Sequence, residues 1–202
     1  MRALLLFSLS FLGACRAAEP AVDGGMPEDA GMPFDGGQDA GHDAGVQCTG
    51  MCQVTSATAQ FGSTQRPFDR AQFGFTSPMN SVSGGWEIHL EMYGGGSPEC
   101  PEQSSPTPDR TVVISGLKLP LTPTVYAADG GVKATLFDFD GDLTSAPLLR
   151  AMQTQLEVVA ANACESCPSA ERFIAFEVMA VFDGGTVSGH VYGTHCGSLD
   201  TL

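Results

Sequence analysis

An all-β, mainly antiparallel fold is predicted for most of this chain by three observations. Short runs that alternate between apolar and polar residues recur between residues 48 and 202. Glycine and proline separate these runs, without the alternation of strand and helix that a parallel sheet requires. Six cysteines lie in the same region. We therefore expect a β-sandwich or a closed barrel, stapled by disulfide bonds.

Residues 1–14 have the pattern of a secretory signal peptide. Arg2 places a positive charge at the start, and a mainly apolar run follows at residues 3–12. This run is too short to cross a bilayer, because a membrane helix needs about 20 apolar residues. We expect the segment to be removed from the mature protein.

Leu12, Gly13, Ala14 and Cys15 end the signal segment. This tetrapeptide resembles the lipobox of bacterial lipoproteins, which implies that Cys15 becomes the lipidated first residue, with palmitate or similar chains. Acyl chains add roughly 0.8 kcal/mol of membrane affinity per buried CH₂, so the bilayer is the expected partner of the N-terminus. The alternative is an ordinary signal peptide that is cut before Cys15. Arg16 replaces the aspartate of the enterobacterial inner-membrane retention pattern, which favours the outer membrane of the cell envelope.

Residues 15–47 are expected to be the lipidated cysteine and a disordered linker. Asp-Gly-Gly and Asp-Ala-Gly recur between Asp23 and Gly45, with few large apolar side chains. Such a composition buries too little surface to offset the entropy of ordering. The repeat is similar to the spacers of myxobacterial lipoproteins, which implies a lineage and no activity. The resemblance does not extend to residues 48–202, which we expect to form a single β-rich domain.

Eight segments of this domain are predicted to be strands. The clearest is 86–93, where Trp86, Ile88 and Leu90 alternate with polar residues. Residues 172–182 are nearly all apolar and predict a central strand, which Asp183-Gly184-Gly185 would connect to the next strand as a hairpin. The other strands are expected near 54–61, 71–75, 111–115, 124–127, 132–139 and 186–193.

Residues 145–163 are compatible with two structures. Apolar residues lie four apart, as on one face of a helix, and Pro147 suits a first helical turn. These apolar residues are Leu148, Met152, Leu156 and Ala160. The same stretch can instead pair as a strand with residues 172–182. We favour a turn or one short helix near 145–151, followed by a strand at 153–161.

The cysteine count predicts three disulfides. Apart from Cys15, the chain has an even set: Cys48, Cys52, Cys100, Cys164, Cys167 and Cys196. An exported chain passes through an oxidising compartment, where such a set forms disulfide bonds. Six cysteines allow 15 connectivities, and sequence spacing does not choose among them.

Two other uses of the cysteines are alternatives to structural bridges. Cys164 and Cys167 form a Cys-x-x-Cys motif, which in thiol redox proteins opens a helix. Here Pro168 and an apolar strand follow the motif, and it contains no basic residue, so a structural bridge is favoured. A zinc site could combine this pair with Cys48 and Cys52, but export favours their oxidation.

Asp138, Asp140 and Asp142 resemble the opening of a calcium loop, because carboxylates two residues apart can wrap one hard cation. The pattern departs from the EF-hand: its glycine comes one position early, and Leu149 occupies the place of the bidentate glutamate. An ordinary Asp-Gly turn is the alternative. Calcium is therefore the one cofactor that the sequence indicates, and the turn is favoured over it.

The acidic charge and the lack of a catalytic motif limit the classes of function that the sequence allows. Residues 48–202 carry 16 acidic and seven basic residues, a formal charge of −9, which argues against nucleic acid and anionic lipid surfaces as partners. No catalytic motif is recognised, and an exposed strand face explains His190 near the C-terminus. We expect a membrane-anchored envelope lipoprotein with a non-catalytic binding or structural role, and an envelope protein or a glycan as ligand. The alternatives are an exported enzyme or thiol redox protein that uses Cys164 and Cys167, and a calcium-binding module.

Overall fold

The computed structural model describes residues 48–202, and these residues form the expected all-β fold. The signal peptide, Cys15 and the linker of residues 16–47 lie outside the described residues. Within residues 48–202 there is no helix of the length and apolarity that a bilayer crossing needs. The strands are β1 (Thr58–Phe61), β2 (Thr64–Pro67), β3 (Arg70–Thr76), β4 (Glu87–Gly94), β5 (Arg110–Lys118), β6 (Val125–Ala127), β7 (Lys133–Asp138), β8 (Leu148–Arg150), β9 (Gln153–Asn162), β10 (Phe173–Phe182) and β11 (Gly185–His195). The short 3-10 helices are η1 (Gly50–Gln53), η2 (Ala128–Gly130), η3 (Ser169–Glu171) and η4 (Gly197–Leu199).

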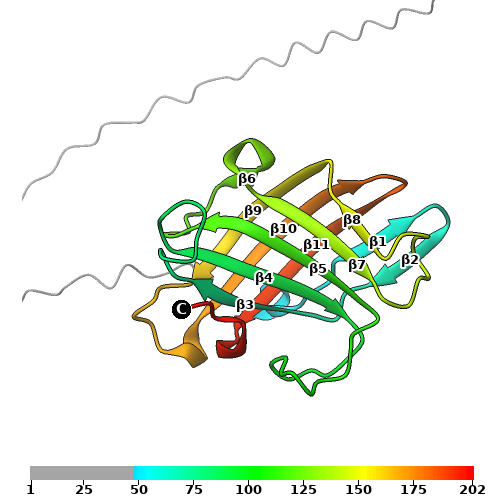
Figure 1. The fold of residues 1–202 in the computed structure, drawn as a ribbon. Coiled ribbons are helices and arrows are strands. Elements are labelled where there is room, and N and C mark those ends of the chain that lie inside the picture. The colour runs from blue at the N-terminus through cyan, green and yellow to red at the C-terminus, as the bar shows by residue number, and fades with distance from the viewer. Residues whose placement is uncertain (1–47) are drawn as a thin grey trace, which may run out of the picture. The chain divides into compact units, whose positions relative to one another are not determined.

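All of these strands belong to one sheet. Neighbouring strands follow the order β6-β9-β10-β11-β3-β4-β5-β7-β8, and the β1–β2 hairpin joins along β11. β11 and β3 pair in parallel, whereas adjacent strands elsewhere in this order are antiparallel. Figure 1 shows that the sheet curls on itself, so that β4, β5 and β7 lie across from β9, β10 and β11. The fold is one curled sheet, and not a sandwich of two separate sheets.

The chain between β8 and β9 joins the two margins of the curled sheet. The strands that end the order, β6 and β8, have three residues each. The N–H of Ala151 donates to the Ala134 carbonyl of β7 at 2.9 Å, and the N–H of Met152 donates to the Val181 carbonyl of β10 at 2.7 Å. These bonds hold β7 beside the β9–β10 hairpin, so one face of the sheet becomes an interior.

The interior is filled by apolar side chains at alternate strand positions. In β4, Ile88, Leu90 and Met92 are buried while the residues between them face outward. The largest fully buried side chains are Phe68, Phe73, Phe176, Phe182, Ile88, Leu90, Met92, Ile114, Leu117, Leu136, Leu156 and Ile174. Burial of each such side chain contributes about 1.5–3 kcal/mol. Ligands of this domain must therefore be sought on its outer face.

The segment 145–163 forms strands rather than a helix. Residues 153–162 are strand β9, as favoured, and Thr154, Leu156, Val158 and Ala160 alternate inward. The short helix near 145–151 is absent, because residues 145–147 are bends and 148–150 form β8. Leu149 pairs with Leu136 of β7, so a sheet edge satisfies backbone groups that a short helix would leave unpaired.

Three disulfides are present, as the cysteine count predicted, and the structure supplies their pairing. Cys48 is bonded to Cys52, Cys100 to Cys196, and Cys164 to Cys167. The Cys100–Cys196 bridge spans 96 positions and ties the loop between β4 and β5 to the end of β11. The other two bridges close loops of only four and three positions.

The Cys100–Cys196 bridge should contribute most to stability. In the chain-entropy model a loop of this length is worth about 4.7 kcal/mol, against about 2 kcal/mol for the four-residue loop that Cys164–Cys167 closes. Replacing both Cys100 and Cys196 by alanine should therefore lower the free energy of unfolding more than replacing Cys164 and Cys167 does. Urea denaturation of the two double variants measures this difference. If both double variants lost the same free energy of unfolding, the Cys100–Cys196 bridge would not be the main stabilising one.

Candidate functional site

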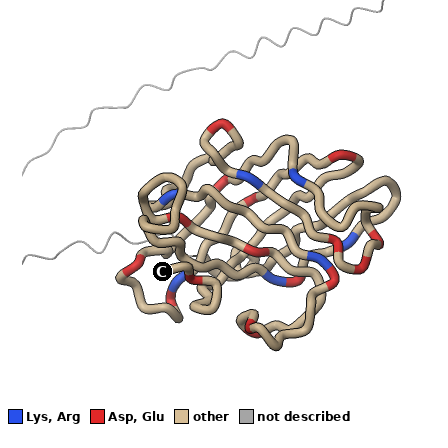
Figure 2. Tube along the Cα trace, viewed as in Figure 1, with Lys and Arg blue, Asp and Glu red and all other residues tan. Residues whose placement is uncertain are grey.

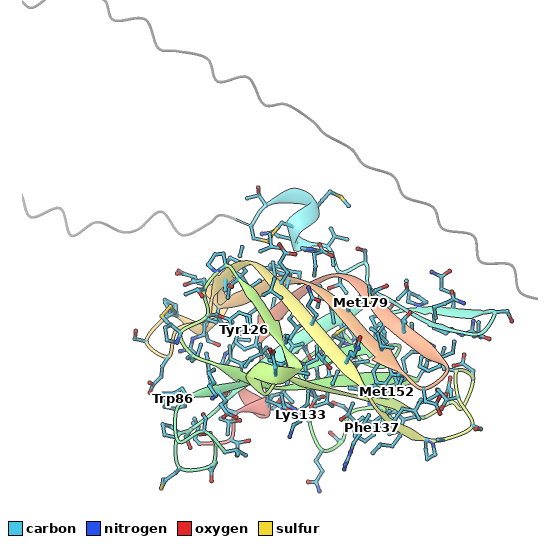
Figure 3. The ribbon with its side chains drawn as sticks, turned by 90° about the horizontal axis from the view of Figure 1, so that it is seen from above. Trp86, Tyr126, Lys133, Phe137, Met152 and Met179 are labelled. Carbon is cyan, nitrogen blue, oxygen red and sulfur yellow. A yellow bond between two sulfur atoms is a disulfide. The ribbon has the colours of Figure 1, made fainter. Side chains whose placement is uncertain are left out.

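The outer face of β4, β5 and β7 carries a row of polar and aromatic side chains. Glu91 and Tyr93 lie on the outer face of β4, opposite Leu90 and Met92, although Tyr93 is only 4% exposed. Tyr93 pairs with Thr111 of β5, and Thr111 pairs with Phe137 of β7. Figure 3 shows Lys133 and Phe137 on the same side of the domain, as expected for residues four apart on one strand. This register places a tyrosine, a threonine and a phenylalanine side by side across three strands.

The loop of residues 95–109 folds over this row and forms a groove of about 370 Å³. We call it the outer groove. Its lining combines strand residues with loop residues, namely Glu91, Tyr93, Pro101, Glu102, Ser105, Pro106, Thr107, Pro108, Thr111, Val113, Phe137 and Phe139. The loop is fixed at its end, where the N–H of Asp109 donates to the Gly94 carbonyl at 2.9 Å. Cys100 ties the loop to Cys196, the residue that follows β11, so the groove wall is covalently held.

One end of the groove presents a hydrogen-bonded carboxylate. Nε2 of His89 lies 2.7 Å from one oxygen of Glu91, and the Tyr93 hydroxyl donates to the other oxygen at 2.5 Å. Burial opposes ionisation of Glu91, but the hydrogen bonds from His89 and Tyr93 outweigh it and lower the pKa of the carboxyl. Burial and the bond to Glu91 raise the pKa of Tyr93. Glu91 is therefore a fixed acceptor and Tyr93 a fixed neutral phenol.

The other end of the groove is aromatic. The rings of Phe137 and Phe139 are stacked, with centroids 6.0 Å apart and an interplanar angle of 11°. Phe139 is 53% exposed, which is high for a phenylalanine. Arg70 lies 4.7 Å from the Tyr93 ring centroid and donates to the Gly95 carbonyl at 2.7 Å, which fixes the tyrosine and the start of the loop. The groove thus offers flat apolar rings beside oriented oxygen atoms.

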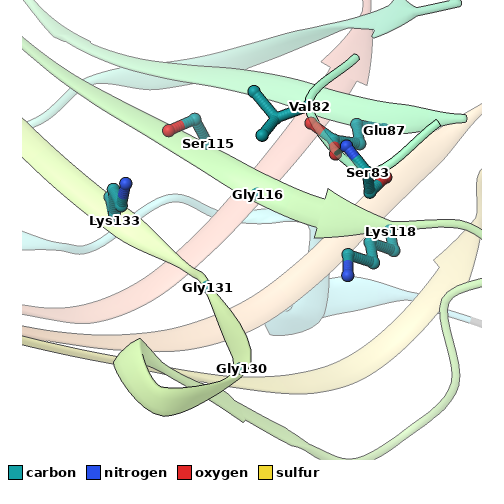
Figure 4. A pocket seen from close by; sticks show the side chains of 9 residues that line it. All are labelled: Val82, Ser83, Glu87, Ser115, Gly116, Lys118, Gly130, Gly131 and Lys133. Atoms are coloured by element: carbon teal, nitrogen blue, oxygen red, sulfur yellow. Dashed lines mark hydrogen bonds between the residues drawn. The ribbon is translucent and has the colours of Figure 1, made fainter. Parts of the chain in front are cut away.

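A second hollow lies further along the same outer face (Figure 4). Its lining includes Lys118 and Lys133, which are the two lysines of the sequence, together with Ser83, Ser115 and Glu87. The register explains this grouping, since Lys133 pairs with Ser115 and Lys118 pairs with Glu87. Cationic side chains across from a glutamate and serines are also what an ordinary solvated strand face contains. The outer groove, with its linked Glu91 and Tyr93, is the better candidate.

The aspartates of the proposed calcium loop do not share one binding site. Asp138 is buried and accepts hydrogen bonds from the backbone N–H groups of Gly141, Leu143 and Thr144 at 2.9–3.2 Å. Asp142 forms an ion pair with Arg66 of β2. Within the described residues no three Asp, Glu, His or Cys side chains are grouped closely enough to hold a metal. Asp138 therefore has a structural use as the acceptor that shapes the 139–144 loop.

The proposed redox pair, Cys164 and Cys167, closes the loop between β9 and β10. The Arg172 side chain donates to the Cys167 carbonyl at 2.8 Å and to the Glu165 carbonyl at 2.5 Å. No redox helix follows the motif, because residues 169–171 form only the short η3. The two cysteine pairs that a zinc site would need are closed as separate disulfides, which removes the thiolate ligands. His190 also has protein partners, since it lies between Glu177 and the Cys52 carbonyl, each at 2.8 Å.

Comparison of the chain with protein-family models, with curated proteins and with solved structures finds no match. The choice of site therefore depends on geometry alone. The groove residues Phe137 and Phe139 were not singled out in the sequence, because their exposure depends on how residues 95–109 fold over the sheet. The one signal was alternation, which placed Glu91 on the polar face of its strand.

Replacing Asp138 by alanine should destabilise the domain by about 1–3 kcal/mol, because backbone N–H groups of the 139–144 loop lose a shared acceptor. Replacing the exposed Asp140 is the matched control and should change stability by less than about 0.5 kcal/mol. Thermal and urea denaturation of both variants measure the difference.

The same proteins test the calcium alternative. Because Asp138 and Asp142 already have protein partners, we expect no change in melting temperature between millimolar calcium and chelator. An ion bound only to the native state would add about 2.7 kcal/mol at a hundredfold excess over its dissociation constant. A calcium-dependent rise that disappears in the Asp140→Ala variant would contradict the structural assignment.

Proposed function

We propose that this protein is a lipid-anchored binding protein of the bacterial cell envelope and that its outer groove holds a neutral carbohydrate. The observation that carries the proposal is the pairing, in one groove, of the stacked Phe137 and Phe139 rings with the oriented oxygens of Glu91 and Tyr93. Sugars have flat faces of C–H groups and a rim of hydroxyls. Such a ligand matches a site with aromatic walls and a few fixed polar groups.

The charge of the groove favours a neutral ligand. Glu91 and Glu102 line it, and Arg70, whose guanidinium lies over the Tyr93 ring, is bonded to the Gly95 carbonyl. An anionic ligand would meet carboxylates in a partly desolvated site. Figure 2 shows acidic residues spread over loops on several sides of the domain. A neutral glycan can instead donate its hydroxyl hydrogens to Glu91.

The anchoring part of the proposal depends on the sequence. The lipobox-like Leu12-Gly13-Ala14-Cys15 supplies the acylation site, and residues 16–47 supply the spacer. A flexible chain of this length has a root-mean-square span of roughly 30 Å. That distance lets the domain clear the lipid headgroups and reach glycans of the envelope. The outer membrane is the proposed location, because Arg16 replaces the inner-membrane retention residue.

Replacing Phe139 by alanine should weaken binding of neutral glucan or mannan oligosaccharides about 2- to 10-fold, since a lost aromatic contact is worth roughly 0.5–1.5 kcal/mol. Replacing Glu91 by glutamine should weaken it about 10- to 100-fold, because hydrogen bonds to a charged acceptor contribute roughly 1.5–3 kcal/mol. Isothermal titration calorimetry measures both effects.

The matched control for Phe139 is Met179→Ala. Met179 is 49% exposed and lies on β10, outside the outer groove. Its removal should leave the affinity unchanged. If the Phe139→Ala, Glu91→Gln and unaltered proteins bound with equal affinity, the outer groove would not be the binding site.

Replacing Cys15 by serine should release the protein from the membrane fraction, because the thiol is the atom that a lipobox offers for acylation. Partition into Triton X-114 measures the change, and a Cys48→Ser, Cys52→Ser double variant, which removes a disulfide but not Cys15, is the control for loss of other cysteines. A Cys15→Ser protein that still enters the detergent phase would contradict the lipid anchor.

A further inference from the structure

A second cluster of chemically active side chains lies away from the outer groove, at the end of the sheet where β10 begins and β11 ends. Oγ of Ser169 lies 2.6 Å from Nδ1 of His195, and Nε2 of His195 lies 3.1 Å from Oδ1 of Asp200. The three residues come from η3, from the end of β11 and from the segment after η4. Figure 1 shows the loop before β10 next to the C-terminal segment, at the same end of the domain.

The hydrogen bonds select the tautomer that a general base needs. Asp200 Oδ1 also accepts the backbone N–H of Phe75 at 2.7 Å, which holds the carboxylate in place. A carboxylate accepts from the Nε2–H of His195, so the other ring nitrogen, Nδ1, has a free lone pair. Nδ1 is the atom that faces the Ser169 hydroxyl. The imidazole is therefore oriented to take the hydroxyl proton, although the two ring nitrogens have exchanged roles relative to the Ser-His-Asp triad, in which Nε2 faces the serine.

The three side chains differ in their exposure to solvent. Ser169 is exposed, whereas the side chain of His195 is 4% exposed and that of Asp200 is 17% exposed. The imidazole packs against the rings of Phe73 and Phe75, with centroids 5.5 and 5.1 Å away. An accessible nucleophile in front of a shielded base is the arrangement that acyl transfer requires.

The surrounding covalent structure holds the cluster rigidly. Cys196 follows His195 and is bonded to Cys100, and Cys167 stands two residues before Ser169 and is bonded to Cys164. Two of the three disulfides thus fix segments that carry the cluster. Preorganised geometry of this kind is what catalytic groups need from a scaffold.

We propose that Ser169 is the nucleophile of an ester hydrolase site, with His195 as general base and Asp200 as the residue that positions it. Ser169 Oγ bonds to the ester carbonyl carbon as its proton passes to His195 Nδ1. The tetrahedral intermediate expels the alkoxide, which takes that proton and leaves as an alcohol. Water repeats these steps on the acyl group of Ser169, releases a carboxylic acid and restores the hydroxyl.

The substrate class is a carboxylic ester rather than an amide. An alkoxide leaves with assistance from one protonated imidazole, whereas an amine leaving group demands stronger stabilisation of the intermediate. Ser169 lies on an exposed turn, where an ester carried by a larger envelope molecule can reach it. The proposed activity does not depend on the outer groove, since none of Ser169, His195 and Asp200 lines it.

The test is a fluorophosphonate probe with the full-length protein. The phosphorus bonds to an activated serine oxygen and fluoride leaves, so tryptic mass spectrometry should find one adduct, at Ser169. The Ser169→Ala protein should show no adduct and should hydrolyse p-nitrophenyl acetate about 10²- to 10⁴-fold more slowly, which is the usual contribution of base-assisted attack. Ser198→Ala, at an exposed serine of η4, should behave as the unaltered protein does.

A second variant separates positioning from structure. Asp200→Asn keeps Oδ1 as the acceptor for both the Phe75 N–H and the His195 Nε2–H but removes the negative charge that stabilises the imidazolium, so kcat should fall about 10²- to 10⁴-fold with KM and melting temperature unchanged. No adduct at Ser169 in the folded protein, or equal ester hydrolysis by the unaltered and Ser169→Ala proteins, would overturn the proposal.

Discussion

The parallel pairing of β3 with β11 is the constraint on which the rest of the structure depends. It joins the antiparallel strands β3, β4, β5, β7 and β8 to the group β9, β10 and β11, so that both share one interior. The pairing is tight, because Gly193 faces Ala71 and a Cβ there would lie 3.3 Å from Leu90. Because apolar side chains of the strands fill the interior of the curled sheet, a ligand can bind only on its outer face. Both proposed sites lie on that outer side or at its end.

Close backbone approaches, rather than side-chain motifs, create the two sites. Gly74 of β3 lies so near the carbonyl of Leu199 that any Cβ would overlap it, and this contact brings Asp200 to Phe75 and His195. At the outer groove, Gly95 has a φ of 73°, which turns the chain back over the sheet, and a Cβ there would meet Asp109 at 2.6 Å. A larger residue at Gly74 or Gly95 would separate the groups that each site needs.

The sequence was informative where a local pattern decides the structure. Alternation at 86–93 predicted strand β4 and put Glu91 on its outer face, and an even cysteine count predicted three disulfides. The pairing of the cysteines and the strand at 148–150 depend on contacts between distant segments, so local periodicity could not select them. The serine cluster was missed for the same reason. Ser169 and Asp200 are 31 positions apart and meet only because the disulfide-closed loop and the C-terminus converge on His195.

The most direct test of the central claim, that the inner face is a filled core and the outer groove binds ligand, is amide chemical-shift mapping. The ¹⁵N-labelled Cys15→Ser protein would be titrated with a neutral glucan oligosaccharide. We expect shifts at Glu91, Tyr93, Phe137 and Phe139 and in the loop of residues 95–109, with the outer face of β9 and β10 unaffected. Shifts confined to β9 and β10, or no shifts with any neutral glycan, would contradict it.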